Sequence, residues 1–453
     1  MSEARVMRFN VVCLGLVFLL VFSGFNTLVG IQHLILNSAK DPASGGYVDG
    51  FYGDGFWSLA TIFMVQTAAN WIAPSVIALV GPRLVMFVSA ITYVLFKAQL
   101  LVLNTELLYA SSVLVGVGAG LMWTTQGHFL AINSDDKTIT QNSGIFWAML
   151  MGSGLIGHAF VYFQFKGSDD IDSETRTVVV TALLGMTIAG TLAVALLRPT
   201  PWVQNNTKES PIQALKNSFT LFCNRDMLML SFSLFYTGIN LNICFAMVGT
   251  CVGFTHAFGT ERKALTNLVG MFMFGGEILG GVILTLFGGR LTKYGRIPIV
   301  VLGFCLSMTA YLLTLLNLPN ECPLRETEPH ETAIIESNRY LAIFTSFLLG
   351  VSDSCINTQS YSIIGTVFKD SSAPAFAIFK FLQSLASSIA FWYSPVLKLY
   401  WQLLIAALCN VCSLIGFCSV EWRRKRSLGE QERDSCHTSA GNTNNGYINE
   451  ECF

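Results

Sequence analysis

The chain has 453 residues and a net charge of −1, and only 12% of its residues are charged, well below the ~25% usual in soluble domains. Apolar residues make up 52% of the chain, and its mean hydropathy is +0.54. A soluble protein of this length could not bury so much apolar surface, so the composition excludes an ordinary soluble protein and predicts one that resides in lipid.

Twelve apolar runs follow one another along the chain, each long enough for the helix of about 20 residues that crosses a ~30 Å hydrocarbon core. The first run follows Arg5 and Arg8, but it is too long for a signal peptide and lacks a small-residue cleavage site, so we expect it to be a span. The predicted spans are Val11–Ile31, Phe56–Val80, Leu84–Leu103, Leu107–Leu130, Gly144–Phe165, Thr177–Leu197, Met227–Val252, Leu265–Gly288, Ile297–Asn317, Tyr340–Gly365, Pro374–Leu397 and Trp401–Val420.

The positive charges between the spans predict the orientation of the chain. With a cytoplasmic N-terminus, the inner segments hold most of the lysines and arginines that lie outside the spans, including Arg423-Arg424-Lys425-Arg426. The outer loops are acidic, as in Asp169-Asp170-Ile171-Asp172. By the positive-inside rule we expect a multi-pass membrane protein with both termini in the cytoplasm, in either the plasma membrane or an endolysosomal membrane.

A polar segment, residues 198–226, divides the chain near its middle. Ser210-Pro211 resembles a helix start, and Ile212, Leu215, Phe219 and Phe222 recur at helical spacing. This pattern fits either an amphipathic helix on the cytoplasmic surface or simply the approach to the seventh span. The chain after Val420 is basic and then rich in Asn, Ser, Gly and Glu, which predicts disorder. We therefore expect an N-terminal bundle (1–197), a linker (198–226), a C-terminal bundle (227–420) and a disordered tail (421–453).

Short strings recur in the same order in the two halves of the chain. They pair the first, second, fourth and fifth spans with the seventh, eighth, tenth and eleventh. The pairs are Ser23-Gly24-Phe25-Asn26 with Thr237-Gly238-Ile239-Asn240, Gly81-Pro82-Arg83-Leu84 with Gly288-Gly289-Arg290-Leu291, Thr125-Gln126 with Thr358-Gln359, and Ile145-Phe146 with Ile378-Phe379. Six spans per half give both halves the same orientation, so we predict an all-α membrane protein of the major facilitator fold, with two six-helix bundles around a central cavity.

One loop supports this fold prediction. Residues 288–296 resemble the short cytoplasmic motif of that superfamily, in which a glycine precedes an acid, a base and then Gly-Arg. Thr292 stands where the acid is usual, and the matching loop at Gly81-Pro82-Arg83 is cut short. These departures argue against the usual gating function of the motif.

Ionisable residues inside the predicted spans are the first candidates for function, because each costs several kcal/mol to insert. Glu277 and Asp353 are expected near the midplane, and Lys380 ~9 Å from the cytoplasmic end. Lys97 lies nearer the outer end, where we expect it to extend to the interface. The acids indicate either a pathway for protons, ions or a polar solute, or an internal salt bridge with Lys380 that locks the C-terminal half.

Four amide side chains complete the predicted cavity lining. Asp353 and Asn357 fall on one helical face, which must face protein or water rather than lipid. We expect Asn240, Asn357, Gln126 and Gln359 to line the cavity, Glu277 and Asp353 to carry proton or cation coupling, and Lys380 to supply the counter-charge.

Several longer strings resemble the uncoordinated-93-like family, a branch of the major facilitator superfamily. They are Trp123-Thr124-Thr125-Gln126-Gly127, Ile132-Asn133-Ser134-Asp135, Asn142-Ser143-Gly144-Ile145-Phe146-Trp147-Ala148, the run from Gly350 to Gln359 and the run from Ser372 to Phe381. The resemblance extends from the first span to the last and implies multi-pass membrane residence and a facilitator fold. It does not imply transport, because members of the family include a receptor chaperone and a potassium-channel regulator.

Two functions follow as expectations. The first is a secondary transporter of a small polar or ionic solute by alternating access, and the second is a scaffold, chaperone or regulatory subunit for a membrane protein partner. Most of the 12 cysteines lie in or beside apolar runs, and no nucleophile, metal or phosphate motif is present in the sequence. We therefore expect no enzymatic activity, no cofactor or metal, and no nucleic acid partner; the lipid bilayer is the expected environment.

Overall fold

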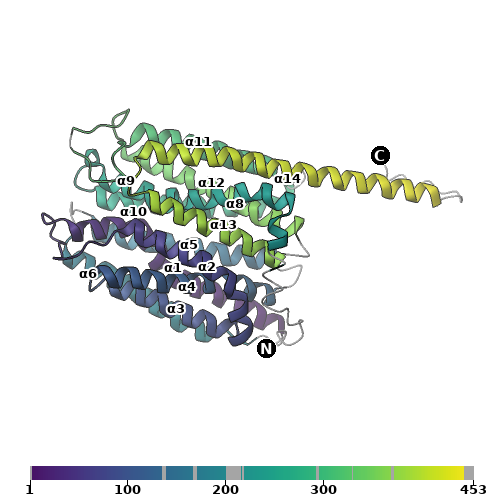
Figure 1. Cartoon of the computed structure of the whole chain (residues 1–453), viewed down its shortest axis with the longest axis horizontal. Coiled ribbons are helices and arrows are strands. Elements are labelled where there is room, and N and C mark those ends of the chain that lie inside the picture. Colours follow the sequence, from purple (N-terminus) through teal and green to yellow (C-terminus); the bar gives the residue numbers. More distant parts are fainter. Residues whose placement is uncertain are drawn as a thin grey trace.

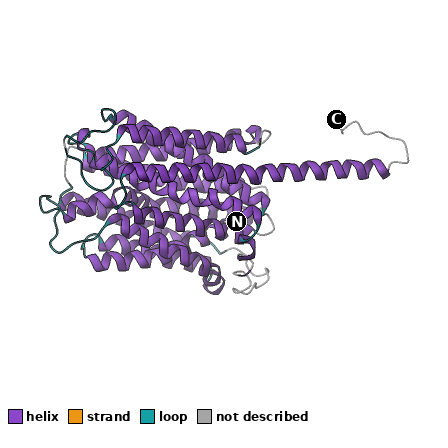
Figure 2. Ribbon diagram, turned by 45° about the horizontal axis from the view of Figure 1, so that its top comes forward, coloured by secondary structure: helices purple, strands orange, loops and turns teal. Residues whose placement is uncertain are grey.

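The computed structural model describes residues 3–134, 139–166, 171–199, 216, 219–291, 295–328, 330–368 and 372–442. In these ranges the chain forms helices and connecting loops without β-strands (Figure 2). The helices lie roughly side by side in one bundle, and both termini emerge at the same end of it (Figure 1). The sequence prediction of an all-helical architecture is confirmed.

Each predicted span lies mostly or wholly in helical structure. The N-terminal half contains α1 (Glu3–Lys40), α2 (Gly55–Val80), α3 (Pro82–Gln99), α4 (Thr105–Ile132), α5 (Ile139–Phe165) and α6 (Ser173–Ala193), which ends in the 3₁₀ turn Val194–Leu196. The C-terminal half contains α8 (Arg225–Asn242), a π-helical turn (Ile243–Met247), α9 (Val248–Phe254), α10 (Arg262–Leu291), α11 (Ile297–Asn317), α12 (Arg339–Val367), α13 (Ser372–Tyr393) and α14 (Leu399–Asn442). The seventh span thus consists of α8, the π turn and α9 in succession.

Polar caps fix where several of the apolar runs begin as helices. The Asp54 side chain accepts hydrogen bonds from the backbone N–H groups of Phe56 and Trp57 at the start of α2. Asp172 caps α6 and Asn338 caps α12 in the same way. Such caps satisfy N–H groups that have no partner within the helix, so loop residues define the helix starts even where the apolar run is continuous.

Ten helical segments of the described chain are long and apolar enough to cross a membrane. The two remaining predicted spans are α2 and α3, which do not meet that measure. Both nevertheless pack directly on α4 within the bundle. Helices α2 and α3 therefore belong to the same bundle as the ten candidate spans.

The packing of the two halves repeats. In the N-terminal half α1 packs on α5 and α6, α4 on α2 and α3, and α3 on α6. The C-terminal half has the corresponding pairs: α8 with α13 and α14, α12 with α10 and α11, and α11 with α14. The parallel repeat predicted from the short strings is thus present in three dimensions.

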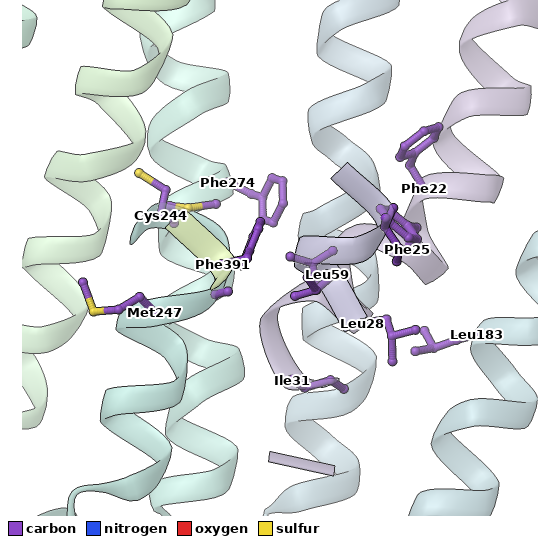
Figure 3. Packing of buried hydrophobic residues seen from close by; sticks show 14 of the residues in the cluster. Phe22, Phe25, Leu28, Ile31, Leu59, Leu183, Cys244, Met247, Phe274 and Phe391 are labelled. Atoms are coloured by element: carbon purple, nitrogen blue, oxygen red, sulfur yellow. The ribbon is translucent and has the colours of Figure 1, made fainter. Parts of the chain in front are cut away.

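The two halves meet mainly along two helix pairs, α2 with α13 and α5 with α10. The pseudo-two-fold axis that relates the halves maps one of these pairs onto the other. One hydrophobic cluster continues through both halves, and Figure 3 shows Leu59 of α2 and Phe391 of α13 among its members. The ring centroids of Phe63 and Phe391 lie 5.3 Å apart. The polar contacts between α2 and α13 include Thr67 Oγ1, which donates to Ser384 Oγ (3.0 Å), and Ser388 Oγ, which donates to the carbonyl oxygen of Ala60 (2.8 Å). On the other side His158 Nδ1 and Asn267 Oδ1 are 3.1 Å apart.

The sequence predicted disorder from residue 421, but α14 continues as a helix to Asn442. Glu421 is fully buried and its carboxylate pairs with Arg296 (2.9 Å) and Arg424 (3.1 Å). The first turn after the last span is therefore part of the packed end of the bundle. The following residues include many Glu, Arg, Gln and Lys, which favour helix although they are polar. Residues 443–453 of the predicted tail lie outside the described ranges.

Other predictions fall mainly on residues that are not described. Residues 200–215, 217 and 218 of the linker are among them, so the surface helix stays a prediction; residues 219–222 are helical. In the loop motif the structure describes Gly288–Leu291 as the end of α10, and Gly295 and Arg296, but residues 292–294 lie outside the described ranges.

Candidate functional site

A cavity lies between the two halves of the bundle. The cavity has a volume of about 120 Å³, whereas one water needs ~10–15 Å³ on the same measure. It can therefore hold several waters or a small solute. Its walls are formed by Phe22, Phe25, Asn26, Val29, Phe63, Gln66, Tyr93, Trp123, Trp147, Leu150 and Met151 of the N-terminal half, and by Leu241, Phe245, Glu277, Asp353, Asn357, Lys380, Gln383 and Ser384 of the C-terminal half.

Both predicted acids lie at this cavity because of where they stand in their helices. Asp353 is the central residue of α12, and Glu277 stands at the middle of α10. Glycines let these two helices approach closely: a Cβ atom added to Gly350 would lie 3.0 Å from the backbone nitrogen of Glu277, and one added to Gly276 would lie 3.0 Å from that of Val351. Small residues permit such contact between membrane helices.

Two amides hold the Asp353 carboxyl group. Asn240 Nδ2 donates to Oδ1 (2.7 Å), and Asn357 Nδ2 donates to Oδ2 (2.9 Å). The predicted pairing of Asp353 with Asn357 on one helical face is thus present. Asn240 is not among the residues that line the cavity; instead it contacts Asp353 from behind the cavity wall.

A hydroxyl network fixes the orientation of Asn240. Tyr311 Oη donates to Asn240 Oδ1 (2.7 Å) and lies 2.8 Å from Tyr236 Oη, which donates to Ser307 Oγ (3.2 Å). The sequence analysis missed these hydroxyls. Their spacing in the sequence could have indicated them. Ser307 and Tyr311 stand one turn apart on α11, and Tyr236 stands one turn before Asn240 on α8, so each pair shares a helical face.

Glu277 lacks such support. Its side chain is fully buried, and its carboxyl oxygens have no hydrogen-bond partner in the described ranges other than the Asp353 carboxyl. The polar group that it faces is the Asp353 carboxyl. A buried carboxyl without a donor is costly unless a proton or a cation neutralises it. Two carboxyls that face one another therefore need a positive charge between them.

Lys380 does not supply that charge by direct pairing. Its Nζ donates to Gln383 Oε1 (2.9 Å) and lies 5.4 Å from the ring centroid of Trp123, 5.4 Å from that of Tyr361 and 4.9 Å from that of Phe379. Within the described chain no ion pair joins Lys380 to either acid. The salt-bridge lock is therefore not formed in this structure, and the lysine instead contacts aromatic faces from both halves.

The two glutamines and Lys97 lie away from the cavity lining. Gln359 is buried and its nearest hydrogen-bond contact, with Thr358 Oγ1, is long at 3.5 Å, whereas Gln126 is half-buried on α4. Lys97 is 1% exposed, so the prediction that it extends to the interface is wrong. Its ammonium lies 5.7 Å from the Tyr93 ring centroid, because this face of α3 points into the N-terminal half rather than toward lipid.

The wall opposite the acids is aromatic. Trp123 of α4 packs edge-on against Phe22, with the ring centroids 5.0 Å apart, and Phe25 packs edge-on against Tyr93 at 4.9 Å. Trp147 of α5 completes this wall. The N-terminal half thus contributes ring faces and edges to the cavity, while the C-terminal half contributes the charges.

The π-helical turn of the seventh span borders the same site. It begins directly after α8 and contains Phe245, which lines the cavity. Asn240 lies less than one turn before it. Such turns are rare and occur often at functional sites. The corresponding span of the N-terminal half, α1, is assigned as one uninterrupted α-helix.

Comparison with known proteins gives a consistent family. Residues 51–418 match the model of a family described as "Ion channel regulatory protein UNC-93". The chain is 37% identical over 443 residues to UNC93-like protein MFSD11 of Xenopus tropicalis, covering 93% of this chain and 98% of the relative. It is 24% identical over 445 residues to protein unc-93 homolog A of Homo sapiens, covering 87% and 89%.

Solved structures show the fold. The nucleoside transporter NupG aligns with a TM-score of 0.62 at 12% identity, over 93% of this chain and 99% of that chain. The xylose transporter XylE from E. coli, in a partially occluded inward-open conformation, aligns with a TM-score of 0.62 at 12% identity, over 91% and 97%. At this level of identity the likeness concerns the fold alone, and it confirms the predicted major facilitator fold.

Proposed function

The chain belongs to the UNC-93 family and is a multi-pass membrane protein of the major facilitator fold, and from this premise we propose that it is a secondary transporter of a small polar or ionic solute. Alternating access of the cavity between the two halves would move the solute. Both termini lie in the cytoplasm in this proposal, because the segments on their side hold most of the lysines and arginines outside the spans.

The observation that carries the proposal is the buried carboxyl of Glu277 at this cavity, whose one polar partner among the described residues is another carboxyl, that of Asp353. A residue kept only for stability would be paired, because an unpaired buried carboxyl destabilises the fold. Glu277 and Asp353 therefore bind and release the coupling proton or cation. Asn240 and Asn357 orient Asp353, and Lys380 supplies the counter-charge. Gln126 and Gln359 would join the lining in another conformation of the cycle.

A second candidate function is that of a scaffold or regulatory subunit of a membrane protein. It is favoured by the description of the matching family as ion channel regulatory proteins. The departures of the loop at 288–296 from the usual motif point the same way. In this function the polar cavity would have no role in transport, and both acids could be neutralised without loss.

The deciding experiment is a flux measurement in proteoliposomes that contain the full chain and a trapped pH indicator. A panel of a nucleoside, a pentose, a zwitterionic amino acid and an organic amine is added in turn. We expect one class to produce a flux that is abolished by Glu277→Gln and Asp353→Asn and preserved by Glu106→Gln, an exposed carboxylate at the start of α4.

Two results would contradict the proposal. The first is a flux that neither substitution changes in rate or in pH dependence, which would remove the coupling role of the two acids. The second is the absence of flux for every class together with co-purification of one stoichiometric membrane protein, which would favour the scaffold.

A further inference from the structure

The cavity contains more negative than positive groups. Two carboxyls face one another, and the one lysine that lines the cavity already donates to Gln383 and lies over three aromatic rings. Asp353 has two amide donors, whereas among the described residues Glu277 has only the Asp353 carboxyl as a polar partner. A solute in this cavity therefore meets a pair of facing carboxyls, and an anionic solute would be repelled there.

The chemistry of the opposite wall narrows the choice among positively charged solutes. Ca²⁺ takes 6–8 oxygen ligands and Mg²⁺ demands near-octahedral oxygen geometry. The N-terminal wall instead supplies the rings of Phe22, Phe25, Tyr93, Trp123 and Trp147, together with the amides of Asn26 and Gln66. Ring faces attract organic cations and bury apolar groups, but they are poor ligands for a hard metal ion.

We propose that the cavity binds a small organic cation, a protonated amine with an apolar and preferably aromatic body. The ammonium would occupy the space at Glu277 and Asp353, and the body would lie against the aromatic wall of the N-terminal half. This inference names the solute of the proposed transport and rests on it. The ammonium and a proton would neutralise the same carboxyl, so each would displace the other.

The contacts of the site support this arrangement from both sides. Hydrogen bonds from an ammonium are charge-assisted, and a carboxylate is their strongest acceptor in proteins. Trp123 already receives one ammonium, that of Lys380, at 5.4 Å from its ring centroid. An amine that spans the cavity would contact both halves at once, as alternating access requires.

The test is a binding measurement by titration calorimetry on the purified full chain in detergent micelles. The probes are 2-phenylethylamine, its neutral analogue 2-phenylethanol, its anionic analogue 3-phenylpropionate and the aliphatic cation butylamine. We expect 2-phenylethylamine to bind at least tenfold more tightly than the alcohol or butylamine, and the carboxylate to show no binding. The four probes separate the charge from the ring.

Two variants identify the residues responsible. Glu277→Gln should weaken 2-phenylethylamine binding at least tenfold and leave 2-phenylethanol unchanged, while Glu106→Gln should change neither. If Glu277→Gln does not fold, Trp147→Leu gives an independent test. It should reduce the preference for 2-phenylethylamine over butylamine, because a ring of the wall is lost while the carboxyls remain.

The outcomes separate this inference from the transport proposal. Binding of the amine without any flux in proteoliposomes would retain the cation site and overturn transport. Flux of a neutral or anionic solute, with no amine binding, would retain transport and overturn the cation site. Tighter binding of 3-phenylpropionate than of the amine, or unchanged amine affinity in a folded Glu277→Gln protein, would also overturn it.

Discussion

The hydrogen bonds of Asp353 allow a test by exchanging two side chains. In Asp353→Asn the new amide cannot accept from both neighbours, because Asn240 presents Nδ2 at 2.7 Å and Asn357 presents Nδ2 at 2.9 Å. Asn240 cannot simply rotate, since its Oδ1 accepts from Tyr311 Oη at 2.7 Å. One amide nitrogen would therefore face another, and a buried donor would lose its acceptor.

The expected cost follows from these contacts. A hydrogen bond to a charged group contributes ~1.5–3 kcal/mol, and an unsatisfied buried donor costs ~1–3 kcal/mol. Removing a buried carboxylate offsets part of this loss, because the desolvation of its charge also disappears. We expect Asp353→Asn to lower the free energy of unfolding by about 2 kcal/mol.

The double exchange Asn240→Asp with Asp353→Asn should recover most of that loss. Asp at 240 would accept from Tyr311 and from the new amide at 353, whose oxygen would accept from Asn357. The coupling energy should then be about 1–3 kcal/mol. The measurement is denaturant unfolding in detergent micelles, followed by tryptophan fluorescence. A double variant no more stable than Asp353→Asn would refute the described network.

Three further predictions concern the packing around the site. Glu421→Gln should lower the free energy of unfolding by about 1–3 kcal/mol, because Arg296 loses a buried carboxylate partner at 2.9 Å. Gly350→Val should cost at least about 3 kcal/mol by overpacking, since a Cβ there would lie well inside van der Waals contact with the backbone carbonyl oxygen of Met273 in the adjacent helix. Lys380→Met and Asp353→Asn should show a coupling energy of about 0.5–1 kcal/mol in denaturant unfolding, because the two charges attract across the cavity without an ion pair between them in the described chain.

Each of these has a control within the chain. Glu106→Gln, an exposed carboxylate, should leave the denaturation midpoint unchanged where Glu421→Gln lowers it. Gly185→Val is the match for Gly350→Val, since a Cβ at Gly185 has open space on α6. Equal losses at the two glycines would show that helix propensity, rather than close packing, determines the effect. A coupling energy above 1 kcal/mol between positions 380 and 353 would restore the salt-bridge lock.

The fold could be predicted because length and apolarity decide what crosses a bilayer. Helix α11 occupies Ile297–Asn317, the range predicted for it. The depth of Asp353 and Glu277 could also be predicted, since depth follows from counting residues along a helix. Their mutual approach could not, because it depends on how α10 and α12 are rotated about their axes. Apolar composition does not fix that rotation; close contacts at Gly276 and Gly350 do.

The predictions that were wrong or missing have the same cause, which is that the sequence does not show which residues pack against one another. Lys97 has the sequence context of a residue that extends to the interface, yet it points into the N-terminal half, because burial depends on which face of α3 meets its neighbours. Tyr236 and Tyr311 have no partner visible in the sequence, since 75 positions separate them in the chain and only the folded bundle brings their hydroxyls together. The helix beyond Val420 was missed because polar composition conceals the burial of Glu421.

The hydroxyls at the contact of α2 with α13 have a consequence for how easily the halves separate. Thr67 Oγ1 also bonds the carbonyl oxygen of Phe63 at 2.7 Å, and Ser384 Oγ bonds that of Lys380 at 2.6 Å. Each hydroxyl therefore keeps an acceptor in its own helix when the contact between Thr67 and Ser384 breaks. Ser388 Oγ differs, because it donates across the same contact to the carbonyl oxygen of Ala60 at 2.8 Å. Separating the helices there removes that acceptor, so the activation barrier for rocking the halves includes this hydrogen bond as well as the apolar contacts such as Phe63 with Phe391.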